Sequence, residues 1–292
     1  MDVFGGIDAG GTSFKCGVFD GEGVCLKSAR IPVTTPDETV RLSAQFFLDM
    51  QASGHQLKTL GVASFGPVGI DPDAPDYGVI GKTSKLDWTG YPLRERLSDL
   101  MGMSIPFNTD VNGALLAERT LGAARGTASA AYITVGTGIG AGIWANGGFL
   151  GFPGHPEFGH VAIARHADDA DFKSVCPFHS DCLEGHASAR AFERRFGDAT
   201  ALAPDHPGWE LEAFYLAEAC RSLYLTARPE RIILGGGLMQ AEGLVSRVQA
   251  SFTKQLTGYG GAGADLALNL ISPAALGDMA GMVGGMLIGN TE

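Results

Sequence analysis

The chain has 292 residues, of which 45% are hydrophobic and 18% charged, so its composition is that of a globular protein long enough for two domains. Its formal net charge of -11 argues against nucleic acid as a main partner, because phosphate backbones are repelled by acidic surfaces. No apolar stretch is long enough to span a membrane and no secretory signal opens the chain, so we expect a cytoplasmic protein without membrane partners.

The apolar pattern predicts alternating strands and helices, which indicates an α/β fold. In chain order we expect strands at 3–8, 14–19 and 25–31, a helix at 36–51, a strand at 60–65, a helix at 93–100, a strand at 105–107, a helix at 112–121, strands at 132–135 and 141–145, helices at 183–196 and 211–226, a strand at 231–234, and helices at 240–256 and 279–287. The first helix has the clearest start, with Thr35 as N-cap, Pro36 at the first helical position and Glu38 closing a capping box.

Two glycine-dense segments of similar layout indicate an internal repeat. "GGIDAGGTSFKCGVFD" (5–20) and "ITVGTGIGAGIWANGG" (133–148) each combine an apolar strand, a glycine loop and a second alternating strand. Consecutive N–H groups in such loops bind anions. We therefore expect two related domains whose hairpins present glycine loops to a shared ligand cleft.

Two other phosphate motifs are rejected. "GTGIGAG" (136–142) has the letters of a dinucleotide fingerprint, but a strand-like sequence follows it where that motif requires a helix. "GKT" (81–83) imitates the end of a P-loop, but Asp76 occupies the required upstream glycine position and no helix is expected after it.

The segment "CPFHSDCLEG" (176–185) places Cys176, His179 and Cys182 at three-residue intervals. A surface loop or a disulfide would be ordinary explanations, but five cysteines in all, an odd number, favour reduced thiols or metal ligands. One more nitrogen or sulfur ligand would complete a closed tetrahedral zinc site. Spacing alone leaves four candidates for that ligand: His155, His160, His166 and His186.

A candidate catalytic acid lies in "FNTDVNGALLAE" (107–118). The pattern predicts that a strand ends at Phe107 and a helix begins near Asn112, so Asn108 and Asp110 would lie on the turn between them. Open α/β sheets bind ligands at this carboxyl end of a strand. Asp110 is also a plausible helix N-cap, which is its alternative structural role.

Six segments together resemble the ROK family of sugar kinases, within the two-domain actin-like ATPase (ribonuclease H-like) fold. The resemblance covers nearly the whole chain and rests on the order and spacing of "GGIDAGGTSFKCGVFD", "NTDVNGALLAE", "ITVGTGIGAGI", "HPEFGH" (155–160), "CPFHSDCLEG" and "ILGGGL" (233–238). The histidine and cysteine motifs look most like the bacterial fructokinase branch. The resemblance implies ATP-dependent phosphorylation of D-fructose to D-fructose 6-phosphate, with two domains that close over the sugar.

The resemblance also implies roles for the residues that contact the sugar. Asp110 would be the catalytic base and Asn108 a partner of a sugar hydroxyl. His160 would be the fourth ligand of a structural zinc ion and, with Glu157 and Glu184, a sugar contact. The residues alone allow simpler roles, since Glu184 could be a first-turn helix acid and Glu157 a solvated loop acid.

ATP would bind to residues from both hairpins and from a third glycine segment. Asp8 would hold Mg2+ through water, because Mg2+ usually keeps several waters and binds only one or two carboxylates. The phosphates would lie between two loops, Gly10, Gly11 and Thr12 in the first and Gly136, Thr137 and Gly138 in the second. The adenine would lie near the third segment, Gly235, Gly236 and Gly237. Many relatives carry lysine where this chain has Ser13, and Lys15, on the same strand face, is the candidate replacement.

Further expectations concern organisation and alternative functions. We expect a first domain of residues 1–111, completed by 275–292, a second domain of 112–274 that contains the zinc motif, and a homodimer, as in the family. A glucokinase or mannokinase of broader specificity is the main alternative, since residues 64–90 differ from the usual fructokinase run. A sugar-responsive regulator and an ATPase without phosphotransfer are others. The chain opens directly on the glycine hairpin, which together with its acidity and Asp110 favours the enzyme over the regulator.

Overall fold

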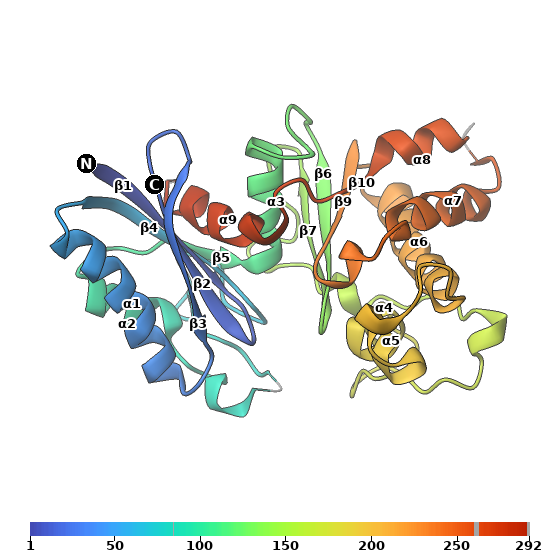
Figure 1. Cartoon of the computed structure of the whole chain (residues 1–292), viewed down its shortest axis with the longest axis horizontal. Coiled ribbons are helices and arrows are strands. Elements are labelled where there is room, and N and C mark those ends of the chain that lie inside the picture. Colours follow the sequence, from blue (N-terminus) through green and yellow to red (C-terminus); the bar gives the residue numbers. More distant parts are fainter. Residues whose placement is uncertain (84, 260–262, 291–292) are drawn as a thin grey trace. The chain divides into compact units, whose positions relative to one another are not determined.

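The computed structural model describes residues 1–83, 85–259 and 263–290, which form two compact units (Figure 1). The first unit contains Met1–Thr120, Gly151–His155 and Asp278–Glu292, of which the last two residues lie outside the described part. The second contains Leu121–Leu150 and Pro156–Gly277. Each unit has its own cluster of buried hydrophobic residues. No helix in the described part of the chain is long and apolar enough to cross a membrane.

The first unit is built on a five-stranded sheet in the order β3-β2-β1-β4-β5. Its strands are β1 (Asp2–Ala9), β2 (Ser13–Phe19), β3 (Cys25–Pro32), β4 (Gln56–Ser64) and β5 (Phe107–Thr109). β1, β2 and β3 pair antiparallel, whereas β1, β4 and β5 pair parallel. Its helices are α1 (Pro36–Ala52), α2 (Leu93–Met101), α3 (Asp110–Thr120) and α9 (Ala280–Gly289).

Helices cover both faces of this sheet. A side chain on Gly5 of β1 would meet Phe47 of α1, and one on Gly6 would meet Met282 of α9. Because successive strand residues point to opposite faces, α1 and α9 lie on opposite sides of β1. Helix α3 packs beside α9, against β4.

The second unit repeats the strand arrangement of the first. Its sheet has the order β10-β9-β6-β7-β8, with antiparallel pairing from β6 through β8 and parallel pairing from β6 through β10. The predicted internal repeat is therefore confirmed at the level of sheet topology. The strands are β6 (Ala130–Val135), β7 (Ile139–Ala145), β8 (Gly148–Phe149), β9 (Arg231–Gly235) and β10 (Ile271–Pro273). The helices are α4 (Leu183–Ala187), α5 (Ala189–Phe196), α6 (Gly208–Thr226), α7 (Leu244–Leu256) and α8 (Ala264–Leu270).

Short 3-10 helices mark several connections. They are η1 (Leu86–Trp88), η2 (Phe158–His160), η3 (Ala167–Asp169), η4 (Ala199–Ala201), η5 (Leu238–Gln240) and η7 (Gly277–Met279).

Several local predictions were wrong in detail. The helix expected at 183–196 is two helices, because Ser188 leaves the helical conformation and its hydroxyl accepts a hydrogen bond from Ala191 N at 3.3 Å. The helix expected from residue 240 begins at Leu244, after η5. Thr35 is the N-cap residue of α1 but makes no side-chain capping bond, and Glu38 accepts from Thr34 Oγ1 at 2.7 Å instead.

The break between the compact units falls after Thr120 instead of after residue 111. The reason lies in α3, which was assigned to the second domain from the sequence but packs on α9 and β4 in the first unit. The C-terminal helix α9 (red in Figure 1) likewise belongs to the first unit, where it lies against β1 (dark blue).

Helix α9 packs closely against the other elements of the first unit because one face of this helix is made of glycine. A methyl group on any of these glycines would overlap neighbouring atoms. The contacts pair Gly281 with the Asp8 carboxylate, Gly284 with the backbone of Gly113 in α3, Gly285 with the backbone of Ile7 in β1, and Gly289 with the backbone of Gly61 in β4. The missing side chains therefore allow backbone to pack directly on backbone.

We predict that Gly284→Ala destabilises the protein even though alanine favours helix by about 1 kcal/mol. The new methyl group would overlap Gly113 backbone atoms, which cannot rotate away, and overpacking of this kind costs roughly 1–3 kcal/mol. The midpoint of urea unfolding should fall. Gly148→Ala is the matched control, because no atom lies within 4 Å of its added methyl group, and an equal midpoint shift in both variants would contradict the prediction.

Candidate functional site

The first glycine loop joins β1 to β2 in a tight turn. Gly10 N donates to both Asp8 O at 3.1 Å and Ser13 O at 3.2 Å, which closes the turn at its base. Gly11 is half-buried and Thr12 is exposed. The hairpin predicted from the sequence is therefore present, with Gly11 and Thr12 at its tip.

Asp8 lies at the end of β1, directly opposite Lys15 on β2. Burial raises the pKa of Asp8 above its ordinary value, and Lys15, whose Nζ lies 3.7 Å from Asp8 Oδ2, acts against that rise. Lys15 Nζ is also 3.6 Å from Asp278 Oδ1. The mostly buried Asp8 carboxylate, beside a loop of N–H groups, fits a divalent cation held through water. Lys15 is already paired with two carboxylates, those of Asp8 and Asp278.

The sequence predicted Asp110 on a turn between a strand and a helix, and this prediction was wrong. β5 continues to Thr109, and α3 begins at Asp110 itself. The capping role belongs to its neighbour, since Thr109 Oγ1 accepts from Asn112 N at 3.2 Å, the bond that a helix N-cap makes. Asp110 Oδ1 accepts from Val111 N at 2.8 Å. The alternative structural role of Asp110 as N-cap is thus filled by Thr109.

Asn108 is held in one orientation by two hydrogen bonds to its side-chain oxygen. Its Oδ1 accepts from Thr109 N and from Asn112 Nδ2, each at 2.8 Å. The amide nitrogen of Asn108 is therefore the group that remains to donate to a ligand oxygen. Asn112, 1% exposed, is a positioning residue that the sequence analysis missed.

The second glycine loop joins β6 to β7, and Gly136 N donates to Gly138 O at 3.0 Å. The strand β7 follows it directly, which confirms that this loop does not open a dinucleotide-binding helix. Glu184 Oε2 accepts from Ile139 N at 3.0 Å, and a side chain on Gly138 would overlap the same oxygen. A candidate sugar residue and a candidate phosphate loop are therefore in direct contact.

The third glycine segment closes strand β9. A side chain on Gly235 would overlap the Tyr132 hydroxyl, and Gly236 has a φ of +94°, a conformation that glycine adopts readily. Only the single turn η5 follows Gly237, and the helix that the sequence predicts from residue 240 starts at Leu244 as α7. Helix-dipole stabilisation of a ligand at this segment is therefore weak.

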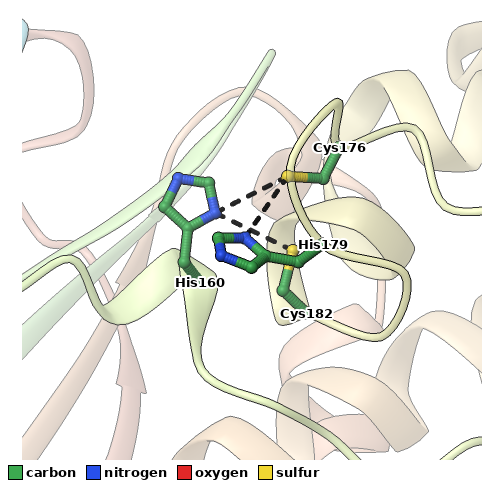
Figure 2. Close-up of side chains that lie close together, drawn as sticks. All are labelled: His160, Cys176, His179 and Cys182. Atoms are coloured by element: carbon green, nitrogen blue, oxygen red, sulfur yellow. Dashed lines mark hydrogen bonds between the residues drawn. The ribbon is translucent and has the colours of Figure 1, made fainter.

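Four side chains of the second unit converge as a candidate metal centre: His160, Cys176, His179 and Cys182 (Figure 2). Their ligand atoms all lie within 4.8 Å of one another. Cys176 Sγ lies 3.8 Å from His160 Nδ1 and 3.7 Å from His179 Nδ1, and Cys182 Sγ lies 3.8 Å from His160 Nδ1. Tetrahedral zinc with ordinary bond lengths requires a sulfur–nitrogen separation of about 3.6 Å, so the donor set and its spacing fit zinc.

Of the four histidines left open by spacing, His160 is the one that joins the cysteines. His186 instead bonds Ser180 O at 2.9 Å. Burial raises the pKa of the Cys182 thiol to about 11, so this sulfur is protonated at neutral pH without a cation. A divalent cation is the partner that would stabilise the thiolate.

The candidate metal centre ties together the two segments that carry the glutamates. His160 ends η2, and its backbone N–H donates to Glu157 O at 2.9 Å. Cys182 is the N-cap of α4, where its sulfur accepts from Gly185 N at 3.4 Å, and Glu184 lies in the first turn. Metal binding would therefore fix Glu157 and Glu184 relative to each other.

A buried ionic network, which the sequence did not indicate, supports the loop between His160 and Cys176. Asp169 pairs with Arg195 in a two-point contact, Oδ1 to Nε at 2.9 Å and Oδ2 to Nη2 at 2.6 Å, and also accepts from the Tyr215 hydroxyl at 2.6 Å. Burial alone would raise the pKa of Asp169, but the bonds from Arg195 and Tyr215 hold it below its ordinary value. Breaking such a pair on one side is strongly destabilising.

The predicted site residues divide between the two units. The first unit holds Asp8, Gly10, Gly11, Thr12, Lys15, Asn108 and Asp110. The second holds Gly136, Thr137, Gly138, Glu157, His160, Cys176, His179, Cys182, Glu184, Gly235, Gly236 and Gly237. Contact is seen between Asp8 and Lys15, among the four metal-ligand candidates, and between Glu184 and the Gly138 loop.

Comparison with known proteins identifies one matching family model and several full-length relatives. The model described as ROK family matches residues 4–292. The chain is 37% identical to a fructokinase of Zymomonas mobilis over 97% of this chain and 94% of that protein. It is 35% identical to a fructokinase of Pediococcus pentosaceus over 98% and 97%, and 27% identical to a glucokinase of Halalkalibacterium halodurans over 96% and 92%.

Solved structures agree with this fold. A ROK hexokinase from Thermus thermophilus superposes with a TM-score of 0.77 at 26% identity, over 99% of this chain and 98% of that one. A ROK glucokinase from Streptomyces griseus, solved with glucose and AMPPNP, gives a TM-score of 0.76 at 22% identity over 99% and 100%. The two-unit α/β architecture is that of the actin-like ATPase fold.

We predict that Cys182→Ser removes most of the bound zinc, because serine oxygen is a poor replacement for thiolate in a structural site. The wild type should contain about one zinc per chain by elemental analysis, and its melting temperature should fall on chelation. Cys25→Ser is the matched control, since Cys25 is a free thiol outside the cluster. Full zinc content in Cys182→Ser, or none in the wild type, would contradict the assignment.

Proposed function

Because the chain belongs to the ROK family, we propose that it is an ATP-dependent hexose kinase that converts D-fructose to D-fructose 6-phosphate. The observation that carries the proposal is full-length similarity to proteins named fructokinase, which exceeds the similarity to the glucokinase. Phosphoryl transfer needs a base at the acceptor, groups that neutralise the phosphates and groups that orient the sugar. The described residues supply candidates for each.

Asp110 is our candidate for the base. Its placement at the first residue of α3, with Thr109 as the cap, supports a role other than helix capping. In the proposed step the sugar 6-hydroxyl oxygen forms a bond to the γ-phosphorus while the bond from that phosphorus to the bridging oxygen of ADP breaks. The hydroxyl proton passes to the Asp110 carboxylate, which holds it until product leaves.

Asn108 would orient the acceptor sugar. Its Nδ2 would donate to a sugar oxygen, since its Oδ1 accepts from Thr109 N and Asn112 Nδ2. From the second unit we assign Glu157, His160 and Glu184 as further sugar contacts. The carboxylates would accept hydrogen bonds from sugar hydroxyls, which are the donors that distinguish one hexose from another.

For ATP, the two hairpin loops are our candidates for the β- and γ-phosphates, and Gly235–Gly237 for the adenine side. Backbone N–H groups of glycine loops bind anions without the cost of a side chain between them. When bound, Mg2+ would neutralise charge on the phosphates, and Asp8 would be the carboxylate that holds it through water. Lys15 would act as a second cation in this region, next to Asp8.

The zinc ion would have a structural role, because His160, Cys176, His179 and Cys182 complete a four-ligand shell without an open position. Its effect on sugar binding would come from the geometry it gives to Glu157 and Glu184. The cytoplasmic location, the homodimer and the closure of two domains over the sugar stay predictions from the sequence.

The direct test is transfer of labelled γ-phosphate from MgATP to fructose, glucose, mannose and N-acetylmannosamine. We expect fructose to be labelled fastest and Asp110→Asn to lower kcat at least a hundredfold, because asparagine can keep the bond to Val111 N but cannot accept the proton. Asp99→Asn, an exposed acid of α2, is the control and should keep wild-type activity.

Each other outcome has a defined meaning. Faster labelling of glucose or mannose would overturn the substrate and favour the broader kinase. ATP hydrolysis without labelled sugar, or no reaction by zinc-replete protein, would contradict the kinase proposal. Full activity of Asp110→Asn would remove Asp110 from the base role.

A further inference from the structure

The connection from residue 81 to 91 in the first unit is folded back against the sheet by a buried tryptophan. Trp88 is 2% exposed, and its ring lies 5.4 Å from that of Phe14, 5.6 Å from Phe65 and 5.5 Å from Tyr91. Phe14 is the second residue of β2, just after the first glycine loop. The anchor therefore holds this connection close to that loop.

Backbone bonds extend the anchor to Lys85. Trp88 N donates to Lys85 O at 2.9 Å, which forms the turn η1, and Gly90 N donates to Ile80 O at 2.7 Å. Lys85 N lies 3.4 Å from Thr83 Oγ1. Ser84, between them, lies outside the described residues. Lys85 is thus fixed at its carbonyl by the same turn that buries Trp88.

The side chain of Lys85 crosses over the first glycine loop. A methyl group built on Gly11 would lie 3.0 Å from Lys85 Cε and 3.8 Å from its Nζ, with no other atom outside the adjacent residues within 4 Å. The side of Gly11 that a larger residue would fill is therefore occupied by a half-buried ammonium group. A side chain at position 11 would therefore compete with Lys85 for this space.

The charge of Lys85 distinguishes it from Lys15. Lys15 Nζ lies within 4.0 Å of carboxylates of both Asp8 and Asp278. No carboxylate in residues 1–83, 85–259 and 263–290 comes that close to Lys85 Nζ. In a chain with a net charge of -11, a cation without an acidic partner beside an anion-binding loop lacks a counterion.

We propose that Lys85 binds the terminal phosphates of the nucleotide at the Gly10–Thr12 loop. This inference rests on the proposed kinase function, since it requires a phosphate ligand at that loop. An ammonium group is a point charge that pairs with phosphate oxygens from many directions, so a flexible lysine fits the role. The Gly10–Thr12 loop has no cation of its own. Lys85 supplies one, whereas Lys15 is already paired with two carboxylates.

The test is nucleotide binding by Lys85→Met, which keeps the length of the side chain and removes its charge. Loss of one charge-assisted hydrogen bond should raise the Kd of MgATP and of MgADP roughly ten- to a hundredfold. The KM for fructose should stay within about twofold, because the sugar does not contact Lys85 in this account. Lys85→Arg should recover most of the affinity, as charge is retained.

Lys82→Met is the matched control, since Lys82 is an exposed lysine of the same connection. It should bind MgATP like the wild type. Melting temperatures of all three variants are compared with the wild type, and Lys85→Arg decides the result if Lys85→Met is less stable. Recovery of MgATP affinity in Lys85→Arg supports a charge role for Lys85. MgATP binding by Lys85→Arg that is as weak as by Lys85→Met overturns that role.

Failure of this inference is distinguishable from failure of the kinase proposal. If the wild type phosphorylates fructose but Lys85→Met binds MgATP with wild-type affinity, Lys85 has no phosphate role and the kinase assignment stands. If the wild type binds MgATP tightly but labels no sugar, the kinase assignment fails, while the change in Kd still decides the role of Lys85.

Discussion

The glycine face of α9 is the constraint on which the first unit depends. It brings the C-terminal helix into backbone contact with β1, β4 and α3, elements that are distant from it in sequence. The same helix touches the Asp8 carboxylate through Gly281 and the first turn of α3, at Gly113, through Gly284. Because α3 begins at Asp110, contacts with one helix position both acids of the proposed reaction.

In the second unit, polar contacts between side chains take the place of the glycine contacts that position residues in the first. The buried Asp169–Arg195 pair holds a region that has little regular secondary structure between β8 and α4. The four candidate metal ligands would hold the same region when a metal ion is bound. Burial makes the charges of Asp169 and Arg195 costly when each is alone, and their mutual contacts offset that cost. Glu184 then links this region to the Gly136–Gly138 loop through Ile139 N. Sugar specificity and phosphate binding would be coupled through that single carboxylate.

The elements that could be predicted from the sequence have local signals. Both hairpins follow from alternation around a glycine loop, and the Cys-x-x-His-x-x-Cys spacing identified three members of the metal cluster. Strand β8, only two residues long, is too short to show a period of its own, and β10 is barely longer. Residues such as Asn112 and Arg195 could not be found, because their partners are set by tertiary packing.

Two local errors have the same physical cause. The helix at 183–196 was expected to be continuous because its apolar period is, yet the Ser188 hydroxyl caps a second helix and interrupts the first. Thr109 was not expected to cap α3 because the adjacent aspartate is an equally good cap in sequence terms. In both places a side-chain hydrogen bond decides the outcome, and sequence pattern alone does not choose between neighbouring donors and acceptors.

The most direct test of the account is a crystal structure of the protein with fructose and a non-hydrolysable ATP analogue. The account predicts an Asp110 carboxylate oxygen within about 3.2 Å of the sugar 6-hydroxyl, in line with the γ-phosphate. A sugar bound with its 6-hydroxyl away from Asp110, or a γ-phosphate away from the Gly10–Thr12 loop, would contradict it.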